Sequence, residues 1–494
     1  MQPVFMIDPN IKSAEDCLVL NVYVNEIRQE RARFQKVLFW IHGGGFILGS
    51  SYGHDAGTLL TDHDVIVVTI NYRLGVLGFL STENEAGPGN YGLWDQVLAL
   101  KWVKDNIAAF GGDPDDITVA GQSAGGSAAS LLALTPHGKG LFTKVYSHSG
   151  TATSLFAKYI NAKNDVLALA KQVSCWDGDI TDEINLAQSG QILECLRTKP
   201  ADQIAQGPTF KLSRANFVPR VDGDFLPTSP LDLLQNDQYL DSIEFYQKAY
   251  LVSYNNNEQQ GTDVLYGMFK TLCFSNDSLT TEEKVNLWSQ TVDAATAENI
   301  GDRLGIDTPP RALVDFVHDW YERRKGRDSA LPVLMSDVSF TIPSYDLLNA
   351  LARSRSTDAW SLYFNHYPGF MRGAFKGMIH GMDLVYLLDL SLGAMASLTG
   401  AGIEGKFTEE DVELRTLYQA VVAEFIKTGS PVKPLLAKLP GGWPTYDLHG
   451  AKYLDFNPSP SVQRNLNREK RELWEKTIPR LATLYQRTTQ HTEL

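Results

Sequence analysis

Residues 116–134 read DITVAGQSAGGSAASLLAL, and this stretch decides the fold. Its first seven residues form a short apolar run that predicts a buried strand, and its last ten form a small-residue run that predicts a helix. Between them lies the G-x-S-x-G pattern GQSAG, with Ser123 at its centre. A sharp turn there lifts a serine hydroxyl clear of the sheet, and the flanking glycines avoid clashes in the turn. We therefore interpret Ser123 as a candidate nucleophile.

Further apolar runs on both sides of this stretch predict more strands. They are rich in β-branched residues and lack polar alternation, which indicates strands buried on both faces of a parallel sheet covered by helices. The predicted strands are 36–42, 64–72, 116–122, 144–150, 248–254 and 359–367. Apolar residues spaced three or four apart predict a helix over 93–110, and a second long helix is expected over 411–427.

The expected fold class is therefore α/β, with a mostly parallel central sheet flanked by helices. The chemically informative residues spread from His42 to His380. This spread favours a single domain over residues 1–494 rather than three independent ones. We expect largely helical or irregular insertions around the pocket at about 151–248 and 262–355.

The composition is that of a globular protein. Of 494 residues, 43% are hydrophobic, and the formal net charge is −14. A negative surface repels phosphate backbones and anionic lipid, so nucleic acid is not an expected partner. No stretch predicts a transmembrane helix. The opening MQPVFMIDPN has no basic segment and no apolar core, so no signal peptide is expected in this sequence and no localisation is predicted.

A glycine-rich loop, His42-Gly43-Gly44-Gly45-Phe46, follows the strand expected over 36–42. Acyl transfer places negative charge on a carbonyl oxygen, and backbone N–H groups stabilise that charge only where no side chain blocks them. The same pattern takes one further donor from the residue after the nucleophile, which is Ala124 here. The sequence therefore predicts an oxyanion hole.

The base and the acid are expected after the nucleophile, in the order Ser, Asp or Glu, His. His380 lies in the loop KGMIHGMDL between two glycines, which makes it the best candidate among the later histidines. The acid should end an intervening strand, and LVSYNNNEQQGTD supplies Glu258, with Asp263 nearby. A carboxylate there would fix the imidazole tautomer and stabilise the imidazolium.

Other residues carry less specific predictions. Cys175 and Cys195 flank a short segment and could pair in an oxidising compartment, but four reduced thiols explain the sequence equally well. Phe46 and Trp94 are candidate pocket walls, although aromatic residues more often pack in a core. No pattern requires a metal or another cofactor.

Several longer stretches together carry a family resemblance. The chain resembles the type-B carboxylesterases, which include cholinesterases, fungal lipases and neuroligin-like adhesion proteins. The matching stretches cover most of the chain and are SAEDCLVLNVYV (13–24), WIHGGGFILGS (40–50), INYRLGVLGFLS (70–81), GNYGLWDQVLALKWVKDNIAAFGGDP (89–114), VAGQSAGG (119–126), ECLRTKPADQI (194–204), VDGDFLP (221–227) and IHGMDLVYLL (379–388).

The resemblance implies an α/β-hydrolase fold with helical insertions and the hydrolysis of small carboxylic esters through an acyl-enzyme. It implies a catalytic triad of Ser123, Glu258 and His380. It implies oxyanion donors at Gly44, Gly45 and Ala124. It further implies a structural ion pair between Glu15 and Arg73. We expect no cofactor and a monomer or weak homodimer.

Two departures from the family concern the N-terminus and the acid. Family members normally have several tens of residues before the stretch that corresponds to SAEDCLVLNVYV (13–24). Those residues include a cysteine partner for Cys17, which here is 16 positions after Met1. The pairing of Cys17 and Cys273 is therefore left open. The family's glutamate is followed by glycine within two residues, whereas Gln259 and Gln260 separate Glu258 from Gly261. Glu258 is still favoured, with Asp263 as the fallback.

A third departure argues against a cholinesterase. Those enzymes carry a glutamate before the nucleophile, where this chain has the neutral Gln122, and a tryptophan where it has the stretch 7–10, IDPN. Without an aromatic face or an adjacent charge, selection of a quaternary ammonium group is not supported. Gln122 is instead a candidate pocket residue. Triacylglycerol lipase activity is one alternative, and a non-catalytic adhesion protein or an inactive fragment is the alternative of another class.

Overall fold

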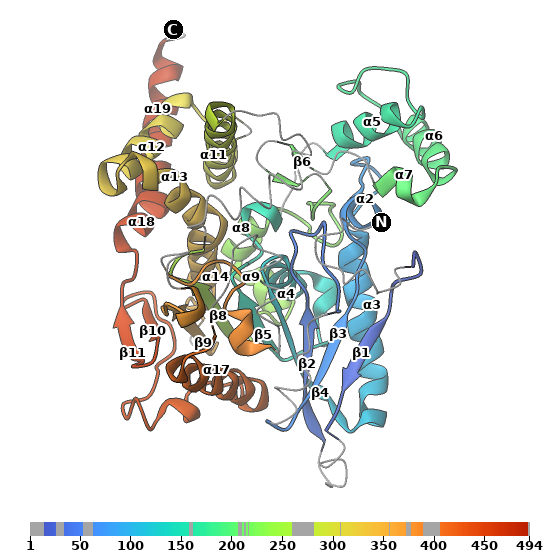
Figure 1. Cartoon of the computed structure of the whole chain (residues 1–494). Helices are drawn as coiled ribbons and strands as arrows, with labels where there is room; N and C mark the ends of the chain where they lie inside the picture. The colour runs from blue at the N-terminus through green and yellow to red at the C-terminus, as the bar shows by residue number, and fades with distance from the viewer. Residues whose placement is uncertain are drawn as a thin grey trace.

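Among the described residues, nine strands form one sheet at the centre of the protein (Figure 1). The computed structural model describes residues 14–25, 34–52, 63–157, 162–205, 210–211, 214–215, 217–258, 281–306, 308–354, 356–371, 377–388 and 406–492. In order across the sheet, the strands are β1 (Leu20–Tyr23), β3 (Val65–Ile70), β2 (Gln35–Ile41), β4 (Gly112–Gln122), β5 (Lys144–His148), β8 (Ala249–Asn255), β9 (Ala359–Phe364), β10 (Lys452–Phe456) and β11 (Ser461–Arg464). This architecture is that of the predicted α/β-hydrolase class.

The seven central strands run parallel, and the two edge strands β1 and β11 are antiparallel to their neighbours. Every residue of β3 is buried, as expected for a strand covered on both faces. The register places Gln122 beside His148, and His148 beside Ser253. Because parallel strands end at one edge of a sheet, the loops after β4, β5, β8 and β9 meet there.

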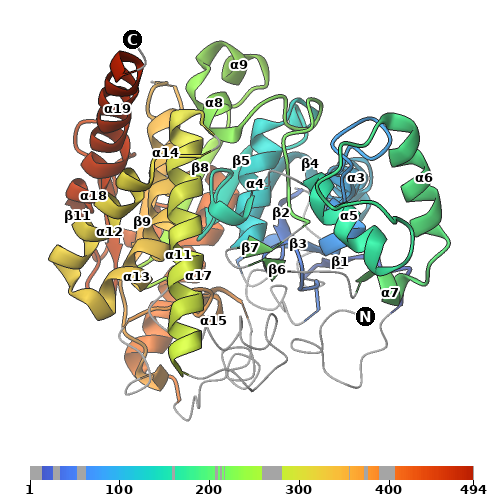
Figure 2. The ribbon, with the colours of Figure 1, turned by 90° about the horizontal axis from the view of Figure 1, so that it is seen from above.

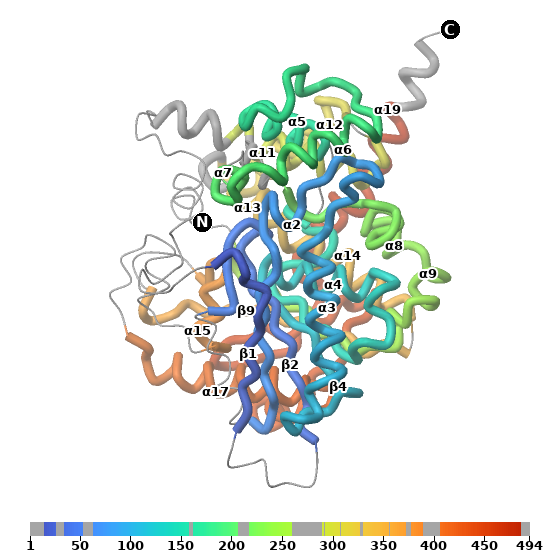
Figure 3. The backbone as a smooth tube through the Cα atoms, turned by 90° about the vertical axis from the view of Figure 1, so that its right-hand side faces the viewer, coloured from blue at the N-terminus to red at the C-terminus, as the bar shows by residue number. Residues whose placement is uncertain are grey.

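Helices cover both faces of the sheet and form two cores. On one face, α3 (Tyr91–Asn106) and α4 (Ala124–Leu134) pack against alternate residues of β2, including Val37, Phe39 and Ile41. On the other face, α17 (Glu409–Thr428) packs with Leu38 and Trp40 of the same strand. Figure 3 shows α3 and α4 on one side of the strands and α17 on the other.

Two groups of helices lie around the sheet edge that holds the candidate site (Figure 2). One group contains α5 (Ala162–Gln172), α6 (Leu186–Arg197) and α7 (Ala201–Ala205). The other contains α11 (Thr281–Leu304), α12 (Arg311–Lys325), α13 (Arg327–Ser336) and α19 (Ile478–Thr492), which share a third core that includes Trp474. The described part of the predicted insertion at 262–355 begins at residue 281.

The remaining elements are short. They are α2 (Gly75–Phe79), η3 (Ile107–Phe110), η4 (Pro136–Gly138), η5 (Leu155–Ala157), β6 (Phe210–Lys211), β7 (Arg214–Ala215), α8 (Pro230–Gln235), α9 (Asp237–Ser242), η6 (Asp337–Thr341), α14 (Ile342–Leu351), η7 (Gly369–Met371), α15 (Leu384–Leu387), η8 (Lys433–Leu435), α18 (Arg468–Glu472) and η9 (Leu473–Thr477). Within the described residues, no helix combines the length and the apolar character that crossing a membrane requires.

All six predicted strands are present, at or within a few residues of their expected positions. The helix expected over 93–110 differs in one respect, because α3 ends at Asn106 and a 3₁₀ turn, η3, continues to Phe110. Gly111 then stops it with φ 82°, a left-handed conformation that glycine adopts without strain.

The close approach of α4 to β2 can be tested at Gly125. A Cβ at Gly125 would lie 2.0 Å from the carbonyl oxygen of Ile41, so Gly125→Ala should lower the free energy of unfolding by more than about 2 kcal/mol. The control is Gly190→Ala in α6, where no described atom outside the helix's own backbone lies within 4 Å of the added Cβ. That change should stabilise by about 0.5–1 kcal/mol. Guanidinium unfolding of both variants checks the prediction, and equal stabilities would contradict it.

Candidate functional site

The turn at Ser123 is strained and is held by close backbone packing. Ser123 joins β4 to α4 with φ 59° and ψ −124°, a combination that non-glycine residues rarely adopt. A Cβ at Gly121 would lie 2.4 Å from the carbonyl carbon of Gly125, and one at Gly150 would lie 2.1 Å from the Ser123 carbonyl oxygen. These contacts explain why glycines surround the serine.

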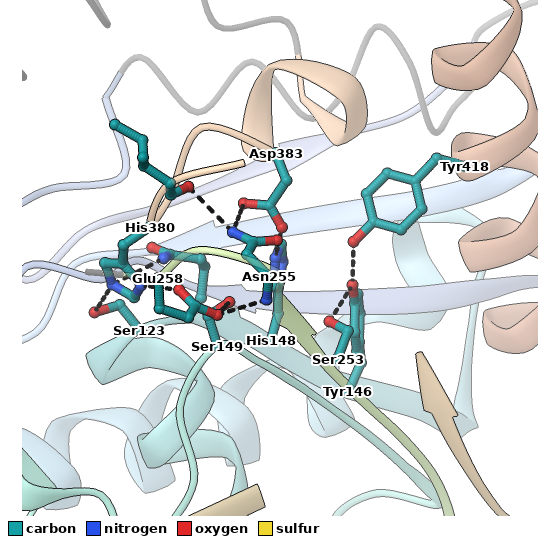
Figure 4. A network of polar contacts seen from close by, with 12 residues as sticks. Ser123, Tyr146, His148, Ser149, Ser253, Asn255, Glu258, His380, Asp383 and Tyr418 are labelled. Carbon is teal, nitrogen blue, oxygen red and sulfur yellow. Dashed lines mark hydrogen bonds and ion pairs between the residues drawn. The ribbon is translucent and has the colours of Figure 1, made fainter. Parts of the chain in front are cut away.

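Ser123, His380 and Glu258 form a continuous chain of hydrogen bonds (Figure 4). The Ser123 Oγ lies 2.8 Å from the His380 Nε2, and the His380 Nδ1 lies 2.7 Å from the Glu258 Oε2. The His380 side chain is 21% exposed, whereas that of Glu258 is fully buried. The structure therefore brings together the three residues that the sequence predicted, with the imidazole between the hydroxyl and the carboxylate.

The Glu258 carboxylate has donors on both oxygens. Its Oε1 accepts hydrogen bonds from the Ser149 Oγ and the Asn255 backbone N–H, each at 2.7 Å. The Glu258 carbonyl also accepts from the backbone N–H of His380 at 3.2 Å. These donors replace the hydration that a carboxylate loses on burial. The alternative acid, Asp263, lies outside the described residues.

The predicted oxyanion loop lies directly beside the serine. A Cβ at Gly43 would lie 2.7 Å from the Gln122 carbonyl oxygen and 3.1 Å from the Ser123 Cβ. The loop then turns through Gly44 and Gly45, both with positive φ, and the backbone N–H groups of Ile47 and Leu48 donate to the Gly44 carbonyl. This close approach suits backbone donors, and the roles of Gly44, Gly45 and Ala124 stay predictions.

Two side chains beside the imidazole complete the site. The Gln122 Nε2 lies 3.2 Å from the His380 Nε2, and its role as a pocket residue stays a prediction. The Phe340 ring centroid lies 4.4 Å from that of His380, and the Phe156 ring packs against Phe340 with its centroid at 5.7 Å. Neither phenylalanine was predicted, because η6 and η5 carry no local motif and reach the site only through tertiary packing.

The two predicted aromatic pocket walls pack elsewhere. Phe46 is fully buried and packs on Phe79, with ring centroids 5.3 Å apart, so its ring belongs to the core. Trp94 packs against His137 at 4.4 Å and Phe225 at 5.3 Å. Both rings therefore contribute to the core on the face of the sheet that α3 and α4 cover.

The predicted Glu15–Arg73 ion pair is replaced by another. Arg73 binds the Asp95 carboxylate through two side-chain nitrogens, at 2.7 and 2.8 Å, and through its backbone N–H at 3.0 Å. Glu15 is exposed. The hydrogen bond to the nearly buried Asp95 raises the pKa of Arg73 above its usual value. The α3 helix supplies Asp95, so this pair joins the helix to the loop after β3.

Cys175 and Cys195 form a disulfide, with Cα atoms 5.6 Å apart, which decides between the two interpretations of these cysteines. The bond joins the segment after α5 to α6. Cys17 is a free, exposed thiol, and Cys273 lies outside the described residues. Among the described residues, no group of three or more His, Cys, Asp or Glu side chains could hold a metal ion.

Comparison with known proteins places the chain in a family. A protein-family sequence model described as "Carboxylesterase family" matches residues 1–474 of this chain. The chain belongs to the carboxylesterase family. Bile salt-activated lipase of Bos taurus is 31% identical over 95% of this chain and 76% of its own length. Pyrethroid hydrolase Ces2a of Mus musculus is 30% identical over 96% of this chain and 77% of its own.

Neuroligin-2 of Homo sapiens has about the same sequence identity to this chain as the lipase and the pyrethroid hydrolase. It is 30% identical over 100% of this chain, which spans only 60% of the length of neuroligin-2. Family membership therefore supports ester hydrolysis in general, whereas the activity of this particular carboxylesterase-family chain depends on the site itself.

The donors to Glu258 provide a stability test. Ser149→Ala removes a hydrogen bond to a buried carboxylate and should lower the free energy of unfolding by about 1.5–3 kcal/mol. The control is Ser130→Ala in α4, whose equally buried Oγ donates to the neutral Ser127 carbonyl. It should cost about 0.5–1.5 kcal/mol or less. Guanidinium unfolding measures both, and a control that costs as much as Ser149→Ala would contradict a charged Glu258.

Proposed function

We propose that the protein hydrolyses small carboxylic esters through an acyl-enzyme on Ser123. The observation that carries this proposal is the hydrogen-bond chain from the serine hydroxyl through the imidazole to a buried carboxylate. A serine hydroxyl is a weak nucleophile until an adjacent base accepts its proton. In this chain His380 is partly exposed and has its Nε2 on that hydroxyl.

The reaction proceeds in two halves. In the first, the Ser123 Oγ attacks the ester carbonyl carbon and passes its proton to the His380 Nε2, which then protonates the departing alkoxide as alcohol. In the second, water attacks the acyl carbon while His380 takes its proton. His380 then returns that proton to the departing Ser123 Oγ, which releases the carboxylic acid and the free serine. Glu258 accepts the Nδ1–H bond throughout and stabilises the imidazolium in each half.

The glycine-rich loop stabilises the negative charge that forms on the carbonyl oxygen of the ester. The proposed donors are the backbone N–H groups of Gly44, Gly45 and Ala124, and each such donor typically contributes about 3 kcal/mol to lowering the barrier. Their fixed backbone geometry requires no reorganisation during the reaction. The Phe340 and Phe156 rings give the site an apolar wall suited to the acyl or alcohol carbons of a neutral ester.

The similarity to neuroligin-2 keeps a binding role as the competing function, and that to bile salt-activated lipase keeps triacylglycerol hydrolysis as a second activity. A protein that only binds needs neither a serine aligned on an imidazole nor a strained turn. The presence of both favours an enzyme. A triolein emulsion offered beside a soluble butyrate ester distinguishes lipase from esterase.

Variants of the hydrogen-bond chain test the proposal with p-nitrophenyl butyrate. Ser123→Ala should reduce kcat by about 10⁶-fold, because the nucleophile is lost, and leave the circular dichroism spectrum unchanged. Glu258→Gln should reduce kcat by about 10⁴-fold, because an amide cannot stabilise the imidazolium. Retention of turnover in Ser123→Ala would remove Ser123 as the nucleophile.

The neutral side chain of Gln122 predicts that the protein does not prefer cationic esters. Because this side chain is neutral and lies beside the imidazole, butyrylcholine should have a kcat/KM no higher than that of a neutral butyrate ester. Gln122→Glu adds a carboxylate there and should raise the butyrylcholine-to-neutral ratio by about 5-fold or more, the effect of roughly 1 kcal/mol of charge attraction. A wild-type protein that prefers butyrylcholine would contradict this view of the pocket.

A further inference from the structure

A second imidazole–carboxylate pair lies beside the candidate triad, to its right in Figure 4. The Nε2 of His148, the last residue of β5, is bonded to the Asp383 Oδ2. The two side chains are 0% and 1% exposed, so neither can reach a substrate. Asp383 follows His380 by three residues, at the start of α15, where its side chain makes no helix-capping bond. The carboxylate is therefore available for contacts with the sheet.

Both members of this pair are connected to the triad through hydrogen bonds of their own or of neighbouring residues. The His148 carbonyl accepts the backbone N–H of Ser123 at 2.9 Å. The next residue, Ser149, donates to Glu258. Asn255 donates its backbone N–H to Glu258 at 2.7 Å and its side-chain N–H to the Asp383 Oδ1 at 3.0 Å. The two buried carboxylates thus share one asparagine.

The loop that carries the base is held at several points by this arrangement. The Asn255 amide also donates to the Ile379 carbonyl at 3.2 Å, and the His380 N–H donates to the Glu258 carbonyl. Asp383 anchors the far end of the same turn through His148 and Asn255. We propose that His148 and Asp383 are positioning residues that fix the His380 loop and add a second buried negative charge behind the imidazole.

The surroundings of the pair suit an ionised Asp383 and a neutral His148. The His148 Nδ1 is buried and has no hydrogen-bond partner among the described residues, so placing the single proton on Nε2 avoids a buried unpaired N–H. Of the other titratable groups that face Asp383, burial raises the pKa values of Tyr146, Tyr418 and Tyr386, which keeps these phenols neutral. Glu258 and His380 face it through Asn255 and the shared loop.

This inference rests on the proposed ester hydrolysis and predicts how the reaction depends on the pair. A second anion favours the imidazolium that His380 becomes during acyl transfer, and the fixed loop keeps Nε2 on the serine hydroxyl. Loss of either contribution lowers kcat rather than raising KM, because no atom of the pair touches the ester. A misplacement of about 1 Å can reduce a rate by about 100-fold.

The chain offers a matched control for the kinetic test. His366 and Asp411 form another buried imidazole–carboxylate pair, at 2.7 Å, with no hydrogen bond to Glu258 or His380 among the described contacts. With p-nitrophenyl butyrate, His148→Leu should lower kcat by about 10- to 100-fold at nearly constant KM, and His366→Leu by less than about 3-fold. His148→Gln, which keeps an N–H near the position of Nε2, should recover most of the lost rate. Equal losses in the two leucine variants, or none in His148→Leu, would overturn the proposal.

A second variant covers the case in which His148→Leu does not fold. Asp383→Asn keeps the size of the side chain and removes its charge. The imidazolium then loses a nearby anion, so the acidic limb of the kcat/KM profile should move to lower pH. An unchanged kcat and pH profile would overturn the proposal.

A wild-type protein that turns over no ester would contradict the proposed function, and the positioning role would then be judged by proton NMR. The downfield resonance of the His380–Glu258 hydrogen bond, assigned through its loss in His380→Ala, should persist in His366→Leu. It should shift or disappear in His148→Leu. A resonance unchanged in His148→Leu would overturn the positioning role independently of turnover.

Discussion

The buried negative charge of Glu258 is the constraint around which the site is organised. A carboxylate taken out of water is stable only where donors replace its hydration. Those donors come from the ends of two parallel strands and from one imidazole: Ser149 after β5, Asn255 at the end of β8, and His380. The charge thereby fixes two strand ends and the His380 loop in one geometry, and the hydroxyl of Ser123 completes it.

The backbone supplies a second constraint of a different kind. The turn at Ser123 is strained, and glycines on both sides allow β2, α4 and the loop after β5 to approach it at distances that a Cβ would prevent. Strain of this kind costs about 1–3 kcal/mol and persists only where the surrounding packing enforces it. A fold that maintains such a turn next to a glycine-rich loop is suited to acyl transfer, and a surface used only for adhesion has no need of it.

Local sequence patterns predicted much of the fold and the turn that carries the candidate nucleophile. The strands were predictable because burial on both faces leaves uninterrupted apolar runs, and Ser123 because its turn needs glycines at fixed spacing. His380 followed from its glycine-flanked loop. Glu258 was less certain from the sequence, since a carboxylate after a strand has no distinctive local pattern and Asp263 was close by.

Other long-range contacts were not predicted from the sequence. Asp95, rather than Glu15, binds Arg73, because α3 presents its carboxylate to the loop after β3. Phe340 reaches His380 from a helical segment without a motif, and His148 meets Asp383 across 235 positions. Each of these depends on which elements become neighbours in space, which periodicity and spacing do not encode.

The central claim is that Ser123 is an activated nucleophile. Its most direct test is incubation of the purified protein with a fluorophosphonate, which reacts with serines that an adjacent base activates, followed by mass spectrometry of the peptides. The account predicts one phosphonyl group per chain, attached to Ser123, and no reaction after heat unfolding. A folded protein that takes up no label, or takes it up at another serine, would contradict the account.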